Sequence, residues 1–135
     1  MTALTTIEGI GPAYEEKLKS AGINSCEELL EKGSNPQGRK TIEEASGIGH
    51  ALVLKFVNHS DLCRIKGVGG EYSELLEAAG VDSVPELAQR NAANLTAAMA
   101  KCNEEKKLVR ALPSEKSVTS WVEQAKELPR VVTHS

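Results

Sequence analysis

The sequence predicts an all-α protein built from two similar halves. Of its 135 residues only 3% are aromatic, whereas β-sheets depend on aromatic and β-branched side chains. Alanine, leucine, glutamate and lysine are abundant, and these residues favour helices. Apolar residues recur at helical spacing between glycines and prolines, and no segment alternates apolar and polar residues as a strand does. The third observation is that the chain repeats itself.

The repeat is clearest between residues 7–30 and 65–88, where 11 of 24 positions are identical at an offset of 58. The two tyrosines of the chain, Tyr14 and Tyr72, occupy the same position of the repeat. A weaker similarity follows at an offset of 65 and places Phe56 at the same position as Trp121. Each half is therefore predicted to hold two helical hairpins. The predicted divisions are residues 1–62, residues 63–128 and a loose C-terminal tail, residues 129–135.

The first half carries start and stop signals for four helices. Proline follows Gly11, at a first helical position where its missing N–H costs nothing. Ser25 with Glu28 forms a capping box that begins the second helix, and Asn35 with Pro36 begins the third. The predicted helices cover residues 12–21, 25–32, 36–46 and 50–59.

The second half repeats the first two of these signals. Its first helix is predicted to end at Gly80, and Ser83 with Glu86 forms the second capping box. The next apolar stripe is predicted to run through Leu95, Met99 and Cys102 and to continue through Leu108 and Leu112. The charged run at residues 104–107 pairs opposite charges and is interpreted as a solvated helix face. The last helix is predicted to place Val118, Trp121, Val122 and Ala125 on one face.

Composition excludes several classes of protein. At 40% hydrophobic and 26% charged residues, the chain is typical of a folded soluble domain. It has no apolar run of about 20 residues that could cross a membrane, and its N-terminal residues lack the features of a secretory signal. A net charge of −3 argues against a general polyanion binder.

No catalytic residue, metal site or cofactor is predicted. The three cysteines are widely spaced and form no C-x-x-C pair, and the three histidines stand at no metal-ligand spacing from them. This cysteine usage favours a cytoplasmic location with reduced thiols. The sequence contains no nucleophile–base pair, carboxylate cluster or Walker loop, so we do not expect an enzyme.

The motif that carries chemistry is a glycine turn placed before a helix. It reads Ile-Glu-Gly-Ile-Gly at residues 7–11, Ile-Lys-Gly-Val-Gly at residues 65–69 and Gly-Ile-Gly at residues 47–49. Such a turn exposes backbone N–H groups at a helix N-terminus, where they can hold an anion. Without Cβ atoms, a phosphate can approach the backbone closely.

These turns resemble the helix-hairpin-helix motif of DNA repair and replication proteins. The whole chain resembles a small bacterial family of unassigned function, made of duplicated tandem helix-hairpin-helix motifs (four hairpins in a SAM-like helical bundle). The resemblance implies that hairpin N–H groups hold DNA phosphates without reading sequence, with lysines nearby. Carried over to this sequence, the nucleic-acid-binding residues would be Gly9, Ile10, Gly11, Lys17, Lys19, Gly47, Ile48, Gly49, Lys55, Gly67, Val68 and Gly69.

The sequence departs from the motif in two respects. Where DNA-binding members often carry a lysine two residues after the second glycine, this chain has Ala13, Ala51 and Glu71, and only the fourth motif has one, Lys116. The fourth turn itself reads Leu-Pro-Ser at residues 112–114, so we expect it to serve structure alone.

Two functions remain open at this point. The first is a non-catalytic, sequence-nonspecific DNA-binding module that binds weakly and through the first half. The second is a protein–protein interaction adaptor, in which the hairpins and their glycines have only a structural role. Charge does not separate them, because residues 1–64 hold 7 basic and 9 acidic side chains, and residues 65–135 hold 9 and 10. The resemblance favours DNA.

Overall fold

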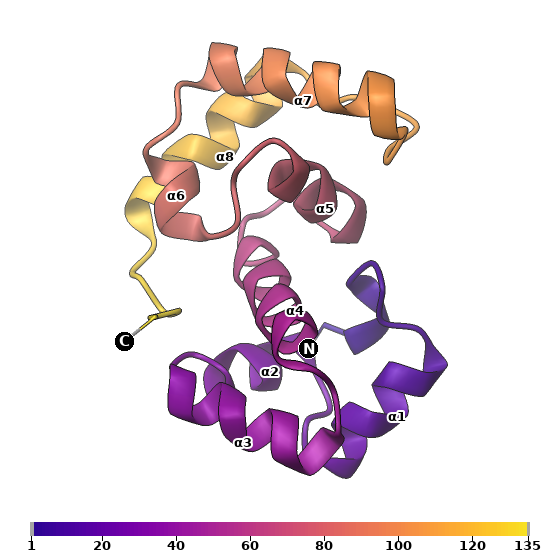
Figure 1. The fold of residues 1–135 in the computed structure, drawn as a ribbon. Coiled ribbons are helices and arrows are strands. Elements are labelled where there is room, and N and C mark those ends of the chain that lie inside the picture. Colours follow the sequence, from indigo (N-terminus) through magenta and orange to yellow (C-terminus); the bar gives the residue numbers. More distant parts are fainter. Residues whose placement is uncertain (1, 135) are drawn as a thin grey trace. The chain divides into compact units, whose positions relative to one another are not determined.

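The computed structural model describes residues 2–134, and this part of the chain contains eight α-helices, one short 3-10 helix and no strand (Figure 1). The all-α prediction is confirmed. The chain forms two compact units: unit 1 is Met1–Asp61 with Val131–Ser135, and unit 2 is Leu62–Arg130. Across residues 2–134, every helix is too short or too polar to span a bilayer.

Unit 1 follows the predicted order of helices. Its elements are η1 (Leu4–Thr6), α1 (Pro12–Ser20), α2 (Cys26–Lys32), α3 (Pro36–Ser46) and α4 (His50–Leu62), whose last residue belongs to unit 2. The predicted caps are present. Ser25 Oγ accepts a hydrogen bond from Glu28 N at 3.1 Å, and Asn35 Oδ1 accepts one from Gly38 N at 2.7 Å.

The core of unit 1 takes one apolar face from each helix. The helices α1 and α2 both pack on α3. Leu18, Leu29, Ile42 and Phe56, one from each of α1 to α4, are at most 3% exposed. Burying such a side chain stabilises the fold by about 1.5–3 kcal/mol, so the unit depends on these contacts more than on helix propensity.

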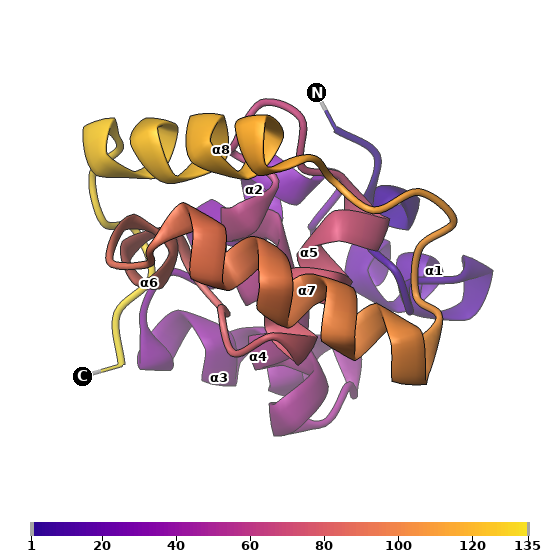
Figure 2. The ribbon, with the colours of Figure 1, turned by 90° about the horizontal axis from the view of Figure 1, so that it is seen from above.

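Unit 2 is organised around its last helix. Its elements are α5 (Gly70–Ala78), α6 (Val84–Ala88), α7 (Ala92–Lys106) and α8 (Glu115–Glu127). The helices α6 and α7 pack on α8, and α5 packs on α7; Figure 2 shows α7 and α8 side by side. Trp121 of α8 is 3% exposed and lies in one cluster with Leu76, Leu87 and Met99.

Hydrogen bonds recur at the offset of 58 residues that the sequence shows. Lys32 Nζ donates to Gly22 O at 2.9 Å, and Arg90 Nη2 donates to Gly80 O at 2.9 Å. Backbone pairs that recur in the same way are Ile10 N to Ile7 O with Val68 N to Ile65 O, and Ile23 N to Leu18 O with Val81 N to Leu76 O. The repeat in the sequence is thus accompanied by a repeat in backbone hydrogen bonding.

The prediction that Leu108 and Leu112 continue the stripe of α7 is wrong. The helix ends at Lys106, Lys107 has a φ of +50°, and Leu112 is 48% exposed. The side chain of Asn103 explains the early end. Its Oδ1 accepts from Val109 N at 2.9 Å and its Nδ2 donates to Val109 O at 3.1 Å, so the chain turns and buries Val109 instead.

The C-terminal tail is also different from the expectation, because it is part of unit 1 rather than loose. Val132 is 2% exposed and lies in the core cluster of unit 1. Thr133 N donates to Ser34 O at 2.7 Å. The buried Arg39 donates through Nη1 to Gly33 O at 2.8 Å and through Nη2 to Thr133 O at 2.7 Å. Burial lowers the pKa of Arg39 from its usual value, an effect that Glu43 opposes.

Ending the chain after Arg130 should therefore destabilise unit 1 by about 3.5–5 kcal/mol, since the buried Val132 contributes about 1.5–3 kcal/mol and the two lost hydrogen bonds of Thr133 about 1 kcal/mol each. Urea denaturation of the truncated and full chains measures the difference. His134→Ala is the matched control, because His134 is exposed in the same tail and its removal should change little. Equal stability of the truncated and full chains would contradict the role given to the tail.

Candidate functional site

Three Gly-x-Gly turns precede helices in the structure: the first turn (residues 9–11) before α1, the second turn (residues 47–49) before α4 and the third turn (residues 67–69) before α5. The first glycine of each has a positive φ, +94° at Gly9, +75° at Gly47 and +100° at Gly67. Only glycine adopts this conformation without cost. The middle residue of each turn is buried, at 4% exposed for Ile10, 3% for Ile48 and 5% for Val68.

The second glycine of each turn is in a different situation. Gly11 has a φ of −92° and Gly69 a φ of −106°, and Gly49 is also outside the left-handed region. A Cβ atom added at any of these three positions would meet no heavy atom within 4 Å. Neither backbone conformation nor packing therefore requires glycine at Gly11, Gly49 or Gly69.

The helices that follow the first and third turns begin without a side-chain cap. Gly11 and Gly69 are the N-cap residues of α1 and α5, and neither helix has a side-chain hydrogen bond at this end. The five helices α2, α3, α6, α7 and α8 are capped by Ser25, Asn35, Ser83, Asn91 and Ser114. The first-turn N–H groups of an uncapped helix have no intrahelical partner and lie at the positive end of the helix dipole.

In unit 1 the first turn meets the helix that the second turn begins. A Cβ at Gly9 would lie 3.6 Å from Phe56 Cε1, and Phe56 stands on α4, seven residues after Gly49. The ring of Tyr14 on α1 contacts the same Phe56 edge-on, with centroids 5.7 Å apart. One aromatic side chain thus connects the elements that carry the two turns.

The predicted lysines of unit 1 are placed separately. Lys17 Nζ lies 5.6 Å from the centre of the Tyr14 ring, and Lys19 Nζ is 3.9 Å from Glu15 Oε2. Lys55 is half-buried on α4. Lys17 and Lys19 therefore each have a partner on α1, and the structure does not show the three ammonium groups gathered at one turn.

Unit 2 shows the same aromatic arrangement with a different second turn. A Cβ at Gly67 would lie 3.0 Å from Trp121 Nε1, and the Trp121 and Tyr72 rings are 5.2 Å apart. Trp121 stands seven residues after Ser114. Val118 N donates to Ser114 O at 3.0 Å, as Val53 N donates to Gly49 O at 3.0 Å. Ser114 therefore takes the place of Gly49, and residues 107–114, the α7–α8 loop, replace the second turn.

The basic residues of this loop, Lys107 and Arg110, are not among the site residues predicted from the sequence. The sequence predicts Lys107 on a helix face, yet it lies just beyond the end of α7. No prediction from the sequence concerns Arg110. The local excess of lysine and arginine around residues 101–116 was the signal that could have found them.

Within residues 2–134, no three His, Cys, Asp or Glu side chains are grouped as metal ligands would be.

The structure thus defines an all-α protein in which glycine turns with an open backbone precede helices. Residues 8–128 match the family described as Domain of unknown function (DUF4332), and because the match covers most of the chain, the protein belongs to this family. No similar curated protein and no similar solved structure was found.

The two glycines of the first turn should respond differently to substitution. Gly9→Ala should destabilise the protein by about 1–2 kcal/mol, because an L residue at a positive φ is strained. Gly11→Ser should leave stability unchanged or raise it by about 0.5–1 kcal/mol, since serine is a good N-cap residue and space is open there. Urea denaturation of both variants checks this. A Gly11→Ser variant that unfolds more easily than Gly9→Ala would show that Gly11 is needed for folding.

Proposed function

We propose that this protein is a non-catalytic, sequence-nonspecific DNA-binding module whose Gly-x-Gly turns bind phosphate oxygens through backbone N–H groups. One observation carries the proposal. Gly11, Gly49 and Gly69 are glycines that neither their φ angles nor their surroundings require. A bulky ligand that closely approaches the backbone would explain the choice of glycine at all three positions.

The uncapped helices support the same function. Serine or asparagine caps most helices of this chain, so the chain has a ready means of satisfying helix N-termini. At Gly11 and Gly69 it has no such cap, which leaves N–H groups available for an anion at the positive end of the helix dipole. A phosphate oxygen matches these donors in charge and geometry.

The order of the elements is consistent with four helix-hairpin-helix motifs in a tandem duplication. The hydrogen bonds that recur at an offset of 58 support the duplication, and the shared places of Phe56 with Trp121 and of Gly49 with Ser114 support the assignment of a second motif in each half. In DNA-binding proteins with such motifs, two hairpins act as a pair. The first and second turns of unit 1, connected through Phe56, are the pair that keeps glycine in both.

Charge favours unit 1 over the third turn. Glu71 stands in the first turn of α5, after Gly69, and would repel a phosphate there. The first turn of α4 has no acidic residue, and the Glu15 carboxylate on α1 is near Lys19. We therefore place the main phosphate contacts at Gly11 and Gly49.

A protein-interaction adaptor is the second candidate. It is favoured by the acidic side chains beside the turns, such as Glu71 and Glu43, whose Oε2 lies 3.0 Å from Nδ1 of His50. In that function the second glycines would have no ligand, and nucleic acid would not bind at low salt.

The decisive variants are Gly11→Ser and Gly49→Ser, alone and together. Each places a Cβ and a hydroxyl in the path of the phosphate while it supplies a cap, so we expect a folded protein that has lost about tenfold or more of its DNA affinity, the equivalent of about 1.4 kcal/mol. Fluorescence anisotropy with a short duplex at low salt measures binding, and thermal denaturation checks the fold.

Gly69→Ser is the matched control, and it should reduce affinity much less than the unit 1 variants. Duplexes of unrelated sequence should bind equally well. Wild-type protein that binds no nucleic acid, or folded Gly11→Ser/Gly49→Ser protein that binds as wild type does, would favour the adaptor.

A further inference from the structure

The α7–α8 loop differs from the three glycine turns in charge. Residues 101–116 hold five Lys/Arg and three Asp/Glu side chains. Stretches of 13 residues around the other turns are residues 7–19 with two Lys/Arg and three Asp/Glu, residues 43–55 with one and two, and residues 65–77 with one and three, and the matching stretch around Ser114, residues 108–120, holds two and one. Of the four turns, this loop with its flanking helix ends alone has an excess of positive charge.

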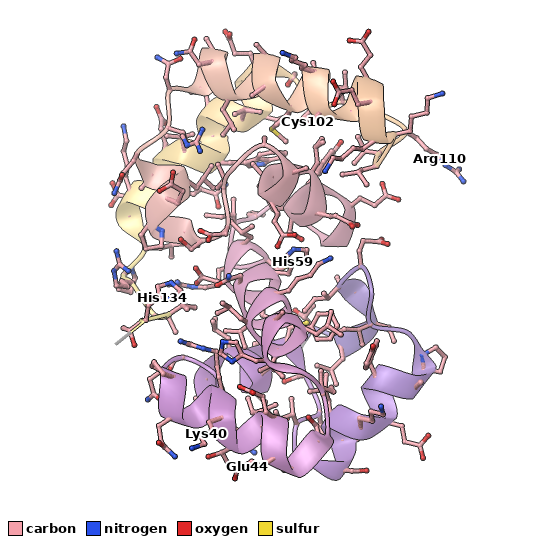
Figure 3. All side chains as sticks on the ribbon, viewed as in Figure 1. Lys40, Glu44, His59, Cys102, Arg110 and His134 are labelled. Carbon is pink, nitrogen blue, oxygen red and sulfur yellow. The ribbon has the colours of Figure 1, made fainter. Side chains whose placement is uncertain are left out.

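These positive charges are available to a ligand. Lys106, Lys107, Arg110 and Lys116 are all exposed, and none of them forms an ion pair with another side chain of residues 2–134. The Arg110 side chain points outward from the loop (Figure 3). Lys19 in unit 1, by contrast, is beside Glu15.

The loop that carries them is held in place at several points. The Asn103 amide binds both backbone groups of Val109, Tyr72 Oη donates to Ala111 O at 2.9 Å, and Ser114 caps α8. A loop fixed in this way loses little conformational freedom when a ligand binds, which favours affinity. The basic side chains are therefore presented from a defined backbone.

Lys107 adds an independent observation. Its φ of +50° is the one positive φ of a non-glycine residue in the described part of the chain, at a helix end where glycine is the usual residue. A lysine at this position is unfavourable for folding, and strained residues of this kind concentrate at functional sites. A charge needed at this point of the loop accounts for lysine in place of glycine.

We propose that the α7–α8 loop and the first turn of α8 form a second phosphate-binding surface, in which the side chains of Lys107 and Arg110 on the loop and Lys116 on α8 replace the backbone N–H groups of a Gly-x-Gly turn. Its ligand is the sugar–phosphate backbone of DNA, so this inference rests on the proposed function. The loop occupies the place of the second turn in unit 2, since Ser114 corresponds to Gly49. The loop then has a binding role, not only the structural one expected from its sequence.

The test uses the full chain with the variants Arg110→Ala, Arg110→Ala/Lys116→Ala and Lys107→Gly. The charge-matched control is Lys126→Ala, since Lys126 is exposed on α8 ten residues, about 15 Å, from Lys116. Anisotropy with one duplex is recorded from about 50 mM to 200 mM salt. Each lost phosphate contact should reduce affinity about tenfold at the lowest salt and lower the log–log salt slope by about 0.9.

Lys107→Gly separates binding from folding. Glycine relieves the positive φ, so this variant should melt at a higher temperature than wild type and yet bind DNA about tenfold more weakly. Arg110→Lys should restore most of the binding lost in Arg110→Ala, because a point charge suffices for a phosphate. Unchanged affinity and slope in both the double variant and Lys107→Gly would overturn the proposal.

Two further results distinguish this surface from other possibilities. If the Gly11→Ser/Gly49→Ser variant loses DNA affinity while the loop variants keep it, this inference is wrong and the proposed function stands. If the loop variants lose DNA affinity while the Gly11→Ser/Gly49→Ser variant keeps it, the result supports the loop and contradicts binding by the glycine turns. Leu112→Ala removes the exposed apolar side chain of the loop without a change of charge, and it should leave DNA affinity as it is. A loss of DNA affinity in Leu112→Ala equal to that in Arg110→Ala would contradict a surface based on charge, and a wild-type chain that binds no DNA would overturn both proposals.

Discussion

In each unit one buried aromatic ring supports a glycine turn, and the remaining features of the candidate site depend on this contact. Phe56 in unit 1 and Trp121 in unit 2 pack against the first glycine of a turn and against the tyrosine five residues after it. A side chain at Gly9 or Gly67 would be strained by its φ angle, and at Gly67 it would also crowd the indole. The ring thus packs against the first glycine of the turn, and the side chain of the middle residue, Ile10 or Val68, is buried in the core. At the second glycine of the turn, Gly11 or Gly69, an added Cβ would meet no heavy atom within 4 Å.

The helices of this protein begin in two ways, with or without a side-chain cap, and the difference affects their stability. Most helices begin with a serine or asparagine that accepts a backbone N–H, a local interaction worth about 1 kcal/mol. The helices after the first and third turns forgo this stabilisation at Gly11 and Gly69. At these positions a single substitution would raise stability. Residues that are less stable than an available alternative are typical of functional sites. The same reasoning applies to Lys107, where glycine would be the more stable choice.

The two units present groups of different chemistry in equivalent places, and we propose that both bind phosphate. At the second turn of unit 1, backbone N–H groups lie beside an open glycine and depend on close approach. At the α7–α8 loop of unit 2, serine caps the helix and charged side chains extend from a braced backbone. Amide donors act over hydrogen-bonding distance, whereas lysine and arginine act over several ångströms and are screened by salt. An overall net charge of −3 is compatible with DNA binding when positive charge is concentrated in one loop.

The sequence by itself determined the features that depend on neighbours along the chain. The all-α class, the caps at Ser25, Asn35 and Ser83 and the paired places of Phe56 and Trp121 all follow from side chains a few positions apart or from the internal repeat. Helix caps are predictable because the donor lies three residues from the acceptor. The repeat locates the glycine turns, but it does not distinguish the glycines that are required by their φ angles from those that are not.

Tertiary structure decided what depends on residues distant in sequence or on competition between local choices. Arg39 and Thr133 lie 94 positions apart, and the docking of the tail on unit 1 depends on their hydrogen bond and on the place of Val132 in the core. Two local structures compete at the end of α7. In one the helix continues and buries Leu108 and Leu112, and in the other the chain forms a loop that buries Val109. The Asn103 amide satisfies both backbone groups of Val109 and so favours the loop, and no periodicity in the sequence reports that interaction.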